Sequence, residues 1–122
     1  IKDYILRDFT KYNVWNEALE IAVEAYKLTP EFPKEEKFGL VSQIRRASIS
    51  ISSNIAEGSS RTSEKDFCRF LEIAIGSGFE IKSQFLLCNK LGFLNAENLR
   101  IIETQLDALL KQLNSLRSKL KY

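Results

Sequence analysis

Residues 40–58 read LVSQIRRASISISSNIAEG, and two periodicities compete within this stretch. Residues 48–52 alternate serine and isoleucine, which is typical of a strand with one buried face. Apolar residues at 40, 44, 47, 51 and 55 instead recur every three or four positions, the spacing of one helix face. Because this second pattern runs unbroken through the alternating segment, and a lone short strand has no partner, the stretch is predicted to be helical.

The same spacing predicts four helices, at about residues 13–28, 34–57, 63–91 and 95–120. Pro30 ends the first helix, since the residue before a proline is pushed out of the helical region, and Pro33 opens the second. Ser63 and Asn95 are suited to cap the third and fourth helices, and Gly92 is suited to follow the third. The expected core faces are Trp15, Ala18, Leu19, Ala22, Val23 and Tyr26 in the first helix, and Leu99, Ile102, Leu106, Leu109, Leu113, Leu116 and Leu120 in the fourth.

The links between these helices are short, around residues 29–33, 59–62 and 92–95. Short links leave consecutive helices little choice but antiparallel packing. The leucine repeat of the fourth helix resembles a coiled-coil seam, which suits a left-handed bundle. The fold class is therefore predicted to be all-α, an antiparallel up-and-down four-helix bundle that forms a single domain over residues 1–122.

The residue inventory argues against a catalytic or metal site. The chain has no histidine and two cysteines, Cys68 and Cys88. This removes the commonest general base, the nucleophile pairs that depend on histidine, and the usual zinc ligand sets. We expect no enzyme activity, no metal and no cofactor. The absence of a membrane-length apolar run, together with two thiols in apolar segments, predicts a cytoplasmic protein with reduced cysteines.

The net charge of +2, from 18 basic and 16 acidic residues, is too close to neutral to indicate nucleic-acid binding by itself. Its distribution is more informative, because no acidic residue follows Asp107. The cations of this tail are candidate phosphate contacts, and they equally complement the negative end of a helix dipole. They are Lys111, Arg117, Lys119 and Lys121.

Charged and small residues in the middle of the second and third helices call for an explanation. An interior glycine costs about 0.8–1 kcal/mol relative to alanine. One interpretation is close packing of the two helices, with Glu57 or Glu80 pairing with Arg45 or Arg46. The other is that the two arginines face RNA phosphates or a subunit interface. The residues concerned are Arg45, Arg46, Asn54, Glu57, Gly58, Gly76, Ser77, Gly78 and Glu80.

These same residues resemble the signature of a known family, the four-helix-bundle proteins encoded in intervening sequences of bacterial 23S rRNA genes. The resemblance covers nearly the whole chain, and its most specific block is residues 54–58. It rests on Trp15 with Ala18; Phe32-Pro33 with Glu36, Gly39 and Leu40; Gln43-Ile44-Arg45-Arg46-Ala47; Ser50-Ile51; Asn54-Ile55-Ala56-Glu57-Gly58; Phe70-Leu71-Glu72-Ile73-Ala74-Ile75-Gly76-Ser77 with Glu80; and Leu91-Gly92-Phe93-Leu94.

The resemblance implies a ring-like homopentamer without enzymatic activity, for which binding to structured RNA such as rRNA has been proposed. It also implies similarity to the accessory proteins of diversity-generating retroelements, which bind nucleic acid and a reverse transcriptase. Arg45 and Arg46 are then candidate RNA contacts, and the alternative is a structural adaptor that docks a protein partner. Two positions depart from the family pattern: Ser52 stands where many members carry proline, and Gly78 where a larger apolar residue is usual.

Overall fold

The computed structural model describes residues 6–120. Within that range every regular element is helical. Lys121, one of the predicted phosphate contacts, lies outside the described residues. The elements are two short 3-10 helices, η1 (Phe9–Lys11) and η2 (Lys34–Glu36), and four α-helices, α1 (Asn13–Leu28), α2 (Leu40–Ser59), α3 (Glu64–Lys90) and α4 (Ala96–Lys119).

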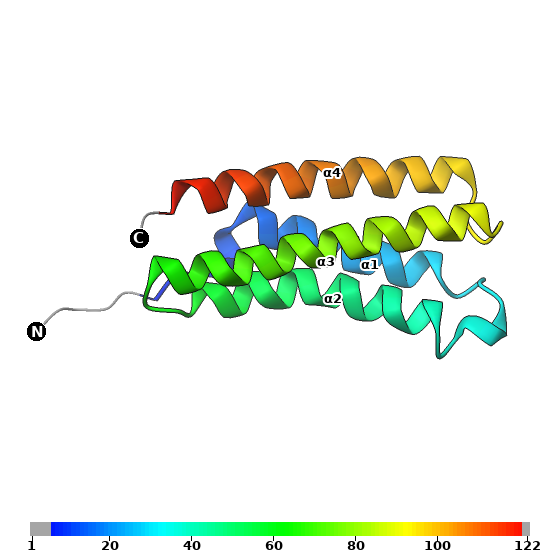
Figure 1. Ribbon diagram of the computed structural model, residues 1–122, viewed down its shortest axis with the longest axis horizontal. Helices are drawn as coiled ribbons and strands as arrows, with labels where there is room; N and C mark the ends of the chain where they lie inside the picture. Colours follow the sequence, from blue (N-terminus) through cyan, green and yellow to red (C-terminus); the bar gives the residue numbers. More distant parts are fainter. Residues whose placement is uncertain (1–5, 121–122) are drawn as a thin grey trace, which may run out of the picture.

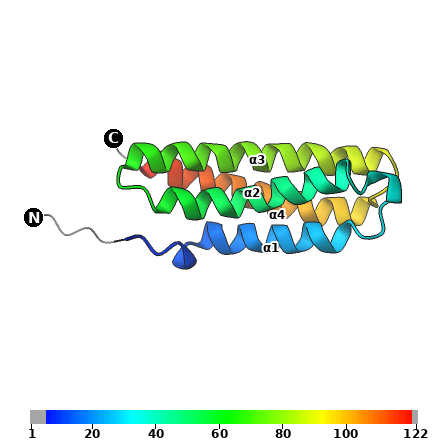
Figure 2. The same cartoon turned by 90° about the horizontal axis from the view of Figure 1, so that it is seen from below.

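The four α-helices form an antiparallel bundle in which successive helices run in opposite directions (Figure 1). Each helix packs on its two neighbours in the order α1, α2, α3, α4 and back to α1, and the contact between α2 and α3 is the most extensive. The diagonal pair α1 and α3 lie on opposite sides of the bundle (Figure 2). The predicted fold class is confirmed.

The helix ends that carry a predicted cap are formed as expected. The side chain of Ser63 accepts a hydrogen bond from the backbone N–H of Asp66 at 3.1 Å, and that of Asn95 accepts from Asn98 at 2.7 Å. Each bond satisfies one N–H that the first turn of a helix leaves without a backbone partner. Gly92 has a φ of +81° and follows α3, the left-handed position that favours glycine.

The predicted start of the second helix at residue 34 is wrong. Pro33 leads into a single 3-10 turn, in which Glu36 donates its N–H to the Pro33 carbonyl at 2.9 Å. Gly39 then takes φ −109° and ψ −106°, far from helical values, and α2 begins at Leu40. A glycine is the residue best able to adopt such a conformation, and the helix cannot continue through it. The apolar spacing alone does not reveal this interruption.

The predicted core face of α1 is also wrong in part. Its buried residues are Val14, Ala18, Ile21 and Ala25, whereas Leu19, Val23 and Tyr26 are exposed. The helix is apolar on two faces, so a three- to four-residue spacing can be followed on either one. Small alanines at two of the four buried positions let α1 approach its neighbours closely, and the bulkier face points outwards.

Elsewhere the core follows the predicted stripes. Ile44, Ala47, Ile51 and Ile55 of α2 are fully buried, and in α4 the residues Ile102, Leu106, Leu109 and Leu113 are at most 1% exposed. Two of the alternating serines of α2, Ser48 and Ser52, bond to the backbone of their own helix, whereas the hydroxyl of Ser50 bonds to other side chains. Ser48 Oγ donates to the Arg45 carbonyl at 2.8 Å.

No helix among the described residues is long and apolar enough to cross a membrane.

Candidate nucleic-acid interface

The link that joins α1 to α2 through η2 lies at the end of the bundle remote from the C-terminal end of α4 (Figure 1). Residues of this link and of the adjoining parts of α1 and α2 line a cationic depression. It consists of two adjoining grooves, of about 380 Å³ and 510 Å³, which share Lys37, Val41 and Arg45. We call this region the Arg45 corner. The residues on which its chemistry depends are Tyr26, Lys34, Lys37, Phe38, Arg45 and Arg46.

The lining of the Arg45 corner carries four cations and no carboxylate. Within the described residues Lys34, Lys37 and Arg45 make no ion pair, and the acids next to them in the chain, Glu35 and Glu36, do not line the grooves. The first turn of α2 also opens here, and no side chain caps it. The positive end of a helix dipole therefore adds to the field of the three unpaired cations.

Arg45 is held in a fixed orientation by α1. Its Nε donates to Thr29 Oγ1 at 3.0 Å, and that hydroxyl donates in turn to the Ala25 carbonyl at 2.9 Å. The guanidinium carbon lies 4.5 Å from the centroid of the Tyr26 ring. Because these contacts occupy one nitrogen and one face, the two terminal nitrogens remain able to donate. No hydrogen bond within the described residues uses them.

Arg46 differs from its neighbour because it has an acidic partner. Its Nη2 lies 3.0 Å from Glu80 Oε2, and the two side chains are 64% and 39% exposed. The expected pairing of an arginine with Glu80 is therefore present, but at the surface. Glu57 pairs instead with Arg61 at 3.3 Å, within the same turn of the chain. Neither Arg45 nor Arg46 is part of a buried ion pair.

The remaining signature residues Asn54 and Ser77 join α2 to α3. Asn54 Nδ2 donates to the Ser50 carbonyl at 2.8 Å and lies 3.0 Å from the Ser50 hydroxyl. That hydroxyl and the Ser77 hydroxyl are 2.8 Å apart across the two helices. These polar groups are satisfied by one another, so their role is to fix how the two helices pack.

The glycine in the last turn of α2, Gly58, and the two in the middle of α3, Gly76 and Gly78, have three different surroundings. A Cβ on Gly58 would lie 2.6 Å from the Phe70 Cβ, so this glycine permits the close approach of α2 and α3. A Cβ on Gly78 would meet Leu110 Cδ2 of α4 at 2.7 Å, and one on Gly76 would meet nothing within 4 Å. Close packing of α2 on α3 thus explains Gly58 but neither Gly76 nor Gly78.

The predicted C-terminal basic cluster is not brought to the Arg45 corner. α4 runs away from that corner, and its final turns lie at the other end of the bundle (Figure 1). Arg117 is engaged by Glu72 at 3.5 Å and by Asn114. Lys111 and Lys119 are exposed near it. The described cations that the sequence singled out therefore form two separate groups.

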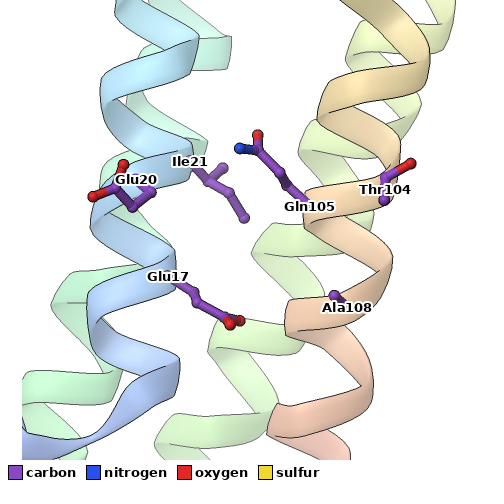
Figure 3. A pocket seen from close by; sticks show the side chains of 6 residues that line it. All are labelled: Glu17, Glu20, Ile21, Thr104, Gln105 and Ala108. Carbon is purple, nitrogen blue, oxygen red and sulfur yellow. The ribbon is translucent and has the colours of Figure 1, made fainter.

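A further groove, of about 350 Å³, lies between α1 and α4 (Figure 3). Glu17 points across it towards α4 and accepts two hydrogen bonds from Gln112, at 2.9 and 3.1 Å. Gln105 points back towards Ile21. The carboxylate of Glu17 is thus occupied in joining α1 to α4. Among residues 6–120, no group of three metal-ligating side chains occurs.

The family model for the 23S rRNA-intervening sequence protein matches residues 10–115, which is most of the chain. The chain belongs to this family. A solved structure from the S23 ribosomal protein family of Bacteroides thetaiotaomicron, described as a protein with unknown function, is similar to it with a TM-score of 0.77. The two sequences are 27% identical, and the match covers 85% of this chain and 97% of that one. No curated protein matches.

Sequence reasoning missed several residues of the corner in this member of the 23S rRNA-intervening sequence protein family. Tyr26 was placed in the core, and Lys34, Lys37 and Phe38 were not singled out. The available signal was Phe38, an aromatic residue between Lys37 and Gly39 at a position where no core face requires one. That these residues meet Arg45 follows only from the way the link folds back on α2.

Proposed function

We propose that this protein is a non-catalytic, homo-oligomeric helical bundle that binds structured RNA such as rRNA, and that the Arg45 corner contacts the RNA. The observation that carries the proposal is the set of unpaired cations in a groove without a carboxylate. Cations of this kind release counterions when they bind phosphates, which is the main source of affinity for nucleic acids. Membership of the 23S rRNA-intervening sequence protein family supports an RNA ligand.

Self-association is supported by apolar side chains that the bundle leaves exposed. On α1 they are Leu19 and Val23, and one outer face of α3 carries Phe79, Leu86 and Leu87 at 64%, 41% and 49% exposure. Tyr26 of α1 is exposed as well, but it lines the Arg45 corner. Exposed apolar strips mark interaction surfaces. α1 and α3 are diagonal in the bundle (Figure 2). Two different strips on opposite sides suit a head-to-tail contact, the kind that closes rings, and the family resemblance leads us to propose a pentamer.

The absence of catalysis is proposed from the chemistry of the residues. The chain has no histidine. Burial raises the pKa of the Cys88 thiol to about 11, so at neutral pH it is protonated and a poor nucleophile. Cys68 is buried as well, and two buried cysteines in apolar segments support a cytoplasmic location. No cofactor is needed for the function proposed.

Native mass spectrometry of the purified protein, with and without nuclease, tests both parts of this proposal. The expected result is a single oligomeric mass that carries RNA before digestion and remains oligomeric after it. A labelled rRNA fragment should then bind with an affinity that falls linearly with salt on logarithmic axes. An oligomer that binds no RNA at low salt would contradict the RNA part and leave the assembly part standing.

The exposed strips also support the second candidate, a structural adaptor that docks a protein partner. A monomer in native mass spectrometry, combined with recovery of one defined protein after nuclease treatment, would favour it. Substitution of Phe79 by serine separates the two cases. Loss of oligomer mass assigns the α3 strip to a second copy of this chain, and loss of the bound protein alone assigns it to a partner.

A further inference from the structure

We propose that the Arg45 corner recognises an unpaired segment of RNA, with a nucleobase stacked on the ring of Phe38. This inference rests on the proposed RNA-binding function and goes beyond it by naming the class of RNA element bound. The geometry that points to it is an exposed aromatic ring and an arginine-backed tyrosine in one groove, bordered by cations that have no acidic partner.

The ring of Phe38 is the starting point, because at 89% exposure it is the most exposed large hydrophobic side chain among the described residues. It lies in the three-residue link between η2 and α2, where the chain turns and no core face claims it. Lys37 Nζ lies 5.3 Å from the ring centroid. The ring therefore presents a π-surface to solvent directly beside a cation.

A second aromatic group faces the same groove. Tyr26 lines it together with Phe38, and the guanidinium of Arg45 covers one face of the tyrosine ring at 4.5 Å. An exposed ring beside an arginine plane is the arrangement with which proteins hold single-stranded nucleic acid, since every base has a π-face and each is joined to a phosphate. The free terminal nitrogens of Arg45 are placed to bind that phosphate.

The pairing state of the RNA decides whether this arrangement is used. In a duplex the faces of the bases are stacked on one another, so only phosphates and sugars reach a surface ring. In a loop, bulge or single-stranded end the base faces are open. Unpaired cations give affinity for either form, whereas an exposed phenylalanine adds affinity only for the second. The ring therefore favours the unpaired form.

A second copy of this chain is a less suitable occupant of the corner. Covering the groove with an apolar surface would bury Lys34, Lys37 and Arg45 without a carboxylate to meet them, which is costly. The apolar strips of α1 and α3 lack such a concentration of unpaired charge and suit self-association better. The polyanion is the occupant whose charge matches the corner.

The test compares two RNA hairpins that share one stem, one with an unpaired loop and one closed by a minimal tight turn, by fluorescence anisotropy. The protein should bind the looped hairpin more tightly. Substitution of Phe38 by alanine should weaken binding to the looped hairpin about 5- to 150-fold, the loss of one stacked base, and leave the other hairpin nearly unaffected. Phe38→Trp should retain the affinity, and Phe38→Leu should not.

Two control variants separate stacking from charge and from assembly. Lys37→Gln should weaken binding of both hairpins and reduce the logarithmic salt slope by about one, whereas Phe38→Ala should leave that slope unchanged. Phe79→Ala removes another exposed phenylalanine, one that belongs to the proposed self-association strip of α3 and does not line the corner. Any loss of affinity through disassembly should affect both hairpins alike, so the ratio of the two affinities should be preserved. Native mass spectrometry of each variant reports the oligomer.

The outcomes distinguish this inference from the function on which it rests. If Phe38→Ala and Phe38→Leu bind the looped hairpin as the wild type does, while Lys37→Gln binds both hairpins weakly, RNA binding stands and base stacking is overturned. If Phe38→Ala lowers the oligomer mass, the ring belongs to a subunit contact and the inference is likewise overturned. If the wild type binds neither hairpin at low salt, the proposed function and the inference fail together.

Discussion

At each end of α2 an arginine lies beside an aromatic ring, but the two guanidinium groups differ in the hydrogen bonds that they donate. At the C-terminal end of α2, Arg7 lies 4.9 Å from the centroid of Phe67 and donates hydrogen bonds to the backbone carbonyls of Ser59, the last residue of α2, and Arg61, in the link to α3. At the other end, Arg45 lies 4.5 Å from the centroid of Tyr26, and its terminal nitrogens donate to no described residue. We call these the closed end and the open end.

The difference shows that an arginine beside an aromatic ring has no fixed meaning. When the chain itself accepts its hydrogen bonds, as at the closed end, the pair holds a link in place. When the donors stay unused and other cations gather around, as at the open end, the pair is ready for an anionic ligand. The positions of carbonyl acceptors in the links, rather than the identity of the arginine and its ring, separate the two roles.

The strongest way to break the closed end is to enlarge Gly58. Gly58→Val should destabilise the protein by about 3 kcal/mol, because even its Cβ would lie 2.6 Å from the Phe70 Cβ and 3.1 Å from Phe67 Cδ1. A Cβ is fixed to the backbone, so α2 and α3 would have to separate. Urea unfolding followed by circular dichroism measures the effect.

Gly76→Ala is the matched control, since it changes a glycine of the same helix pair with nothing within 4 Å of the new carbon. It should stabilise the protein by up to about 1 kcal/mol through helix propensity. Unchanged stability of Gly58→Val would show that the close approach at this crossing is not required.

The interior of the open end can be tested through Cys88, whose pKa is raised to about 11 from 9.0 by burial. Below pH 9 the thiol is protonated in both folded and unfolded chains. Between pH 9 and 11 the unfolded chain loses this proton while the folded protein keeps it, so the stability from Cys88 is lost as the pH rises. The expected loss between pH 9 and 11 is up to about 2 kcal/mol.

Comparison with Cys88→Ala isolates this contribution, because lysines and tyrosines titrate in the same range in both proteins. The wild type should lose more stability than the variant between pH 9 and 11. Equal pH dependence would mean that water reaches the thiol and that the open end is loose throughout, rather than open only at its surface.

How far the sequence predicted each region depended on whether the decisive partners were near in the chain. The helical state of residues 40–57, which belong to both the predicted helix and α2, follows from local spacing, and the cap at Ser63 follows from the first turn of α3. The pairing of Arg46 with Glu80 was expected in outline, because the stripes of α2 and α3 face each other.

The Arg45 corner could not be assembled in that way. It requires the end of α1, the link and the first turns of α2 to meet at one point, and the sequence pattern placed helix instead of a link at residues 34–39. The apolar spacing of α1 was ambiguous between two faces, so Tyr26 was assigned to the core. Which face a helix buries is decided by its neighbours, and that information is not local.

Replacing each of the two arginines in turn gives the most direct test of the contrast between the ends. Arg7→Gln should lower stability by about 1 to 2 kcal/mol, because part-buried carbonyls lose a charged donor, and leave RNA affinity unchanged. Arg45→Gln should weaken RNA binding and reduce the logarithmic salt slope by about one, with a smaller loss of stability. The two measurements are urea unfolding and anisotropy titration at several salt concentrations. Equal effects of both substitutions on affinity would remove the distinction.

The smallest effect is expected at the border of the open end, where Arg46 and Glu80 are 3.0 Å apart. Their side chains are 64% and 39% exposed, so water screens the pair, and a double-mutant cycle with Arg46→Gln and Glu80→Gln should give a coupling of about 0.2 to 1 kcal/mol. A coupling of several kcal/mol is the mark of a buried pair and would contradict the exposure.

Glu80→Gln alone should also strengthen RNA binding, because it releases a fourth cation, Arg46, at the edge of the groove. If that substitution leaves the affinity unchanged while Arg45→Gln lowers it, the RNA path follows the link side of α2 and does not reach α3.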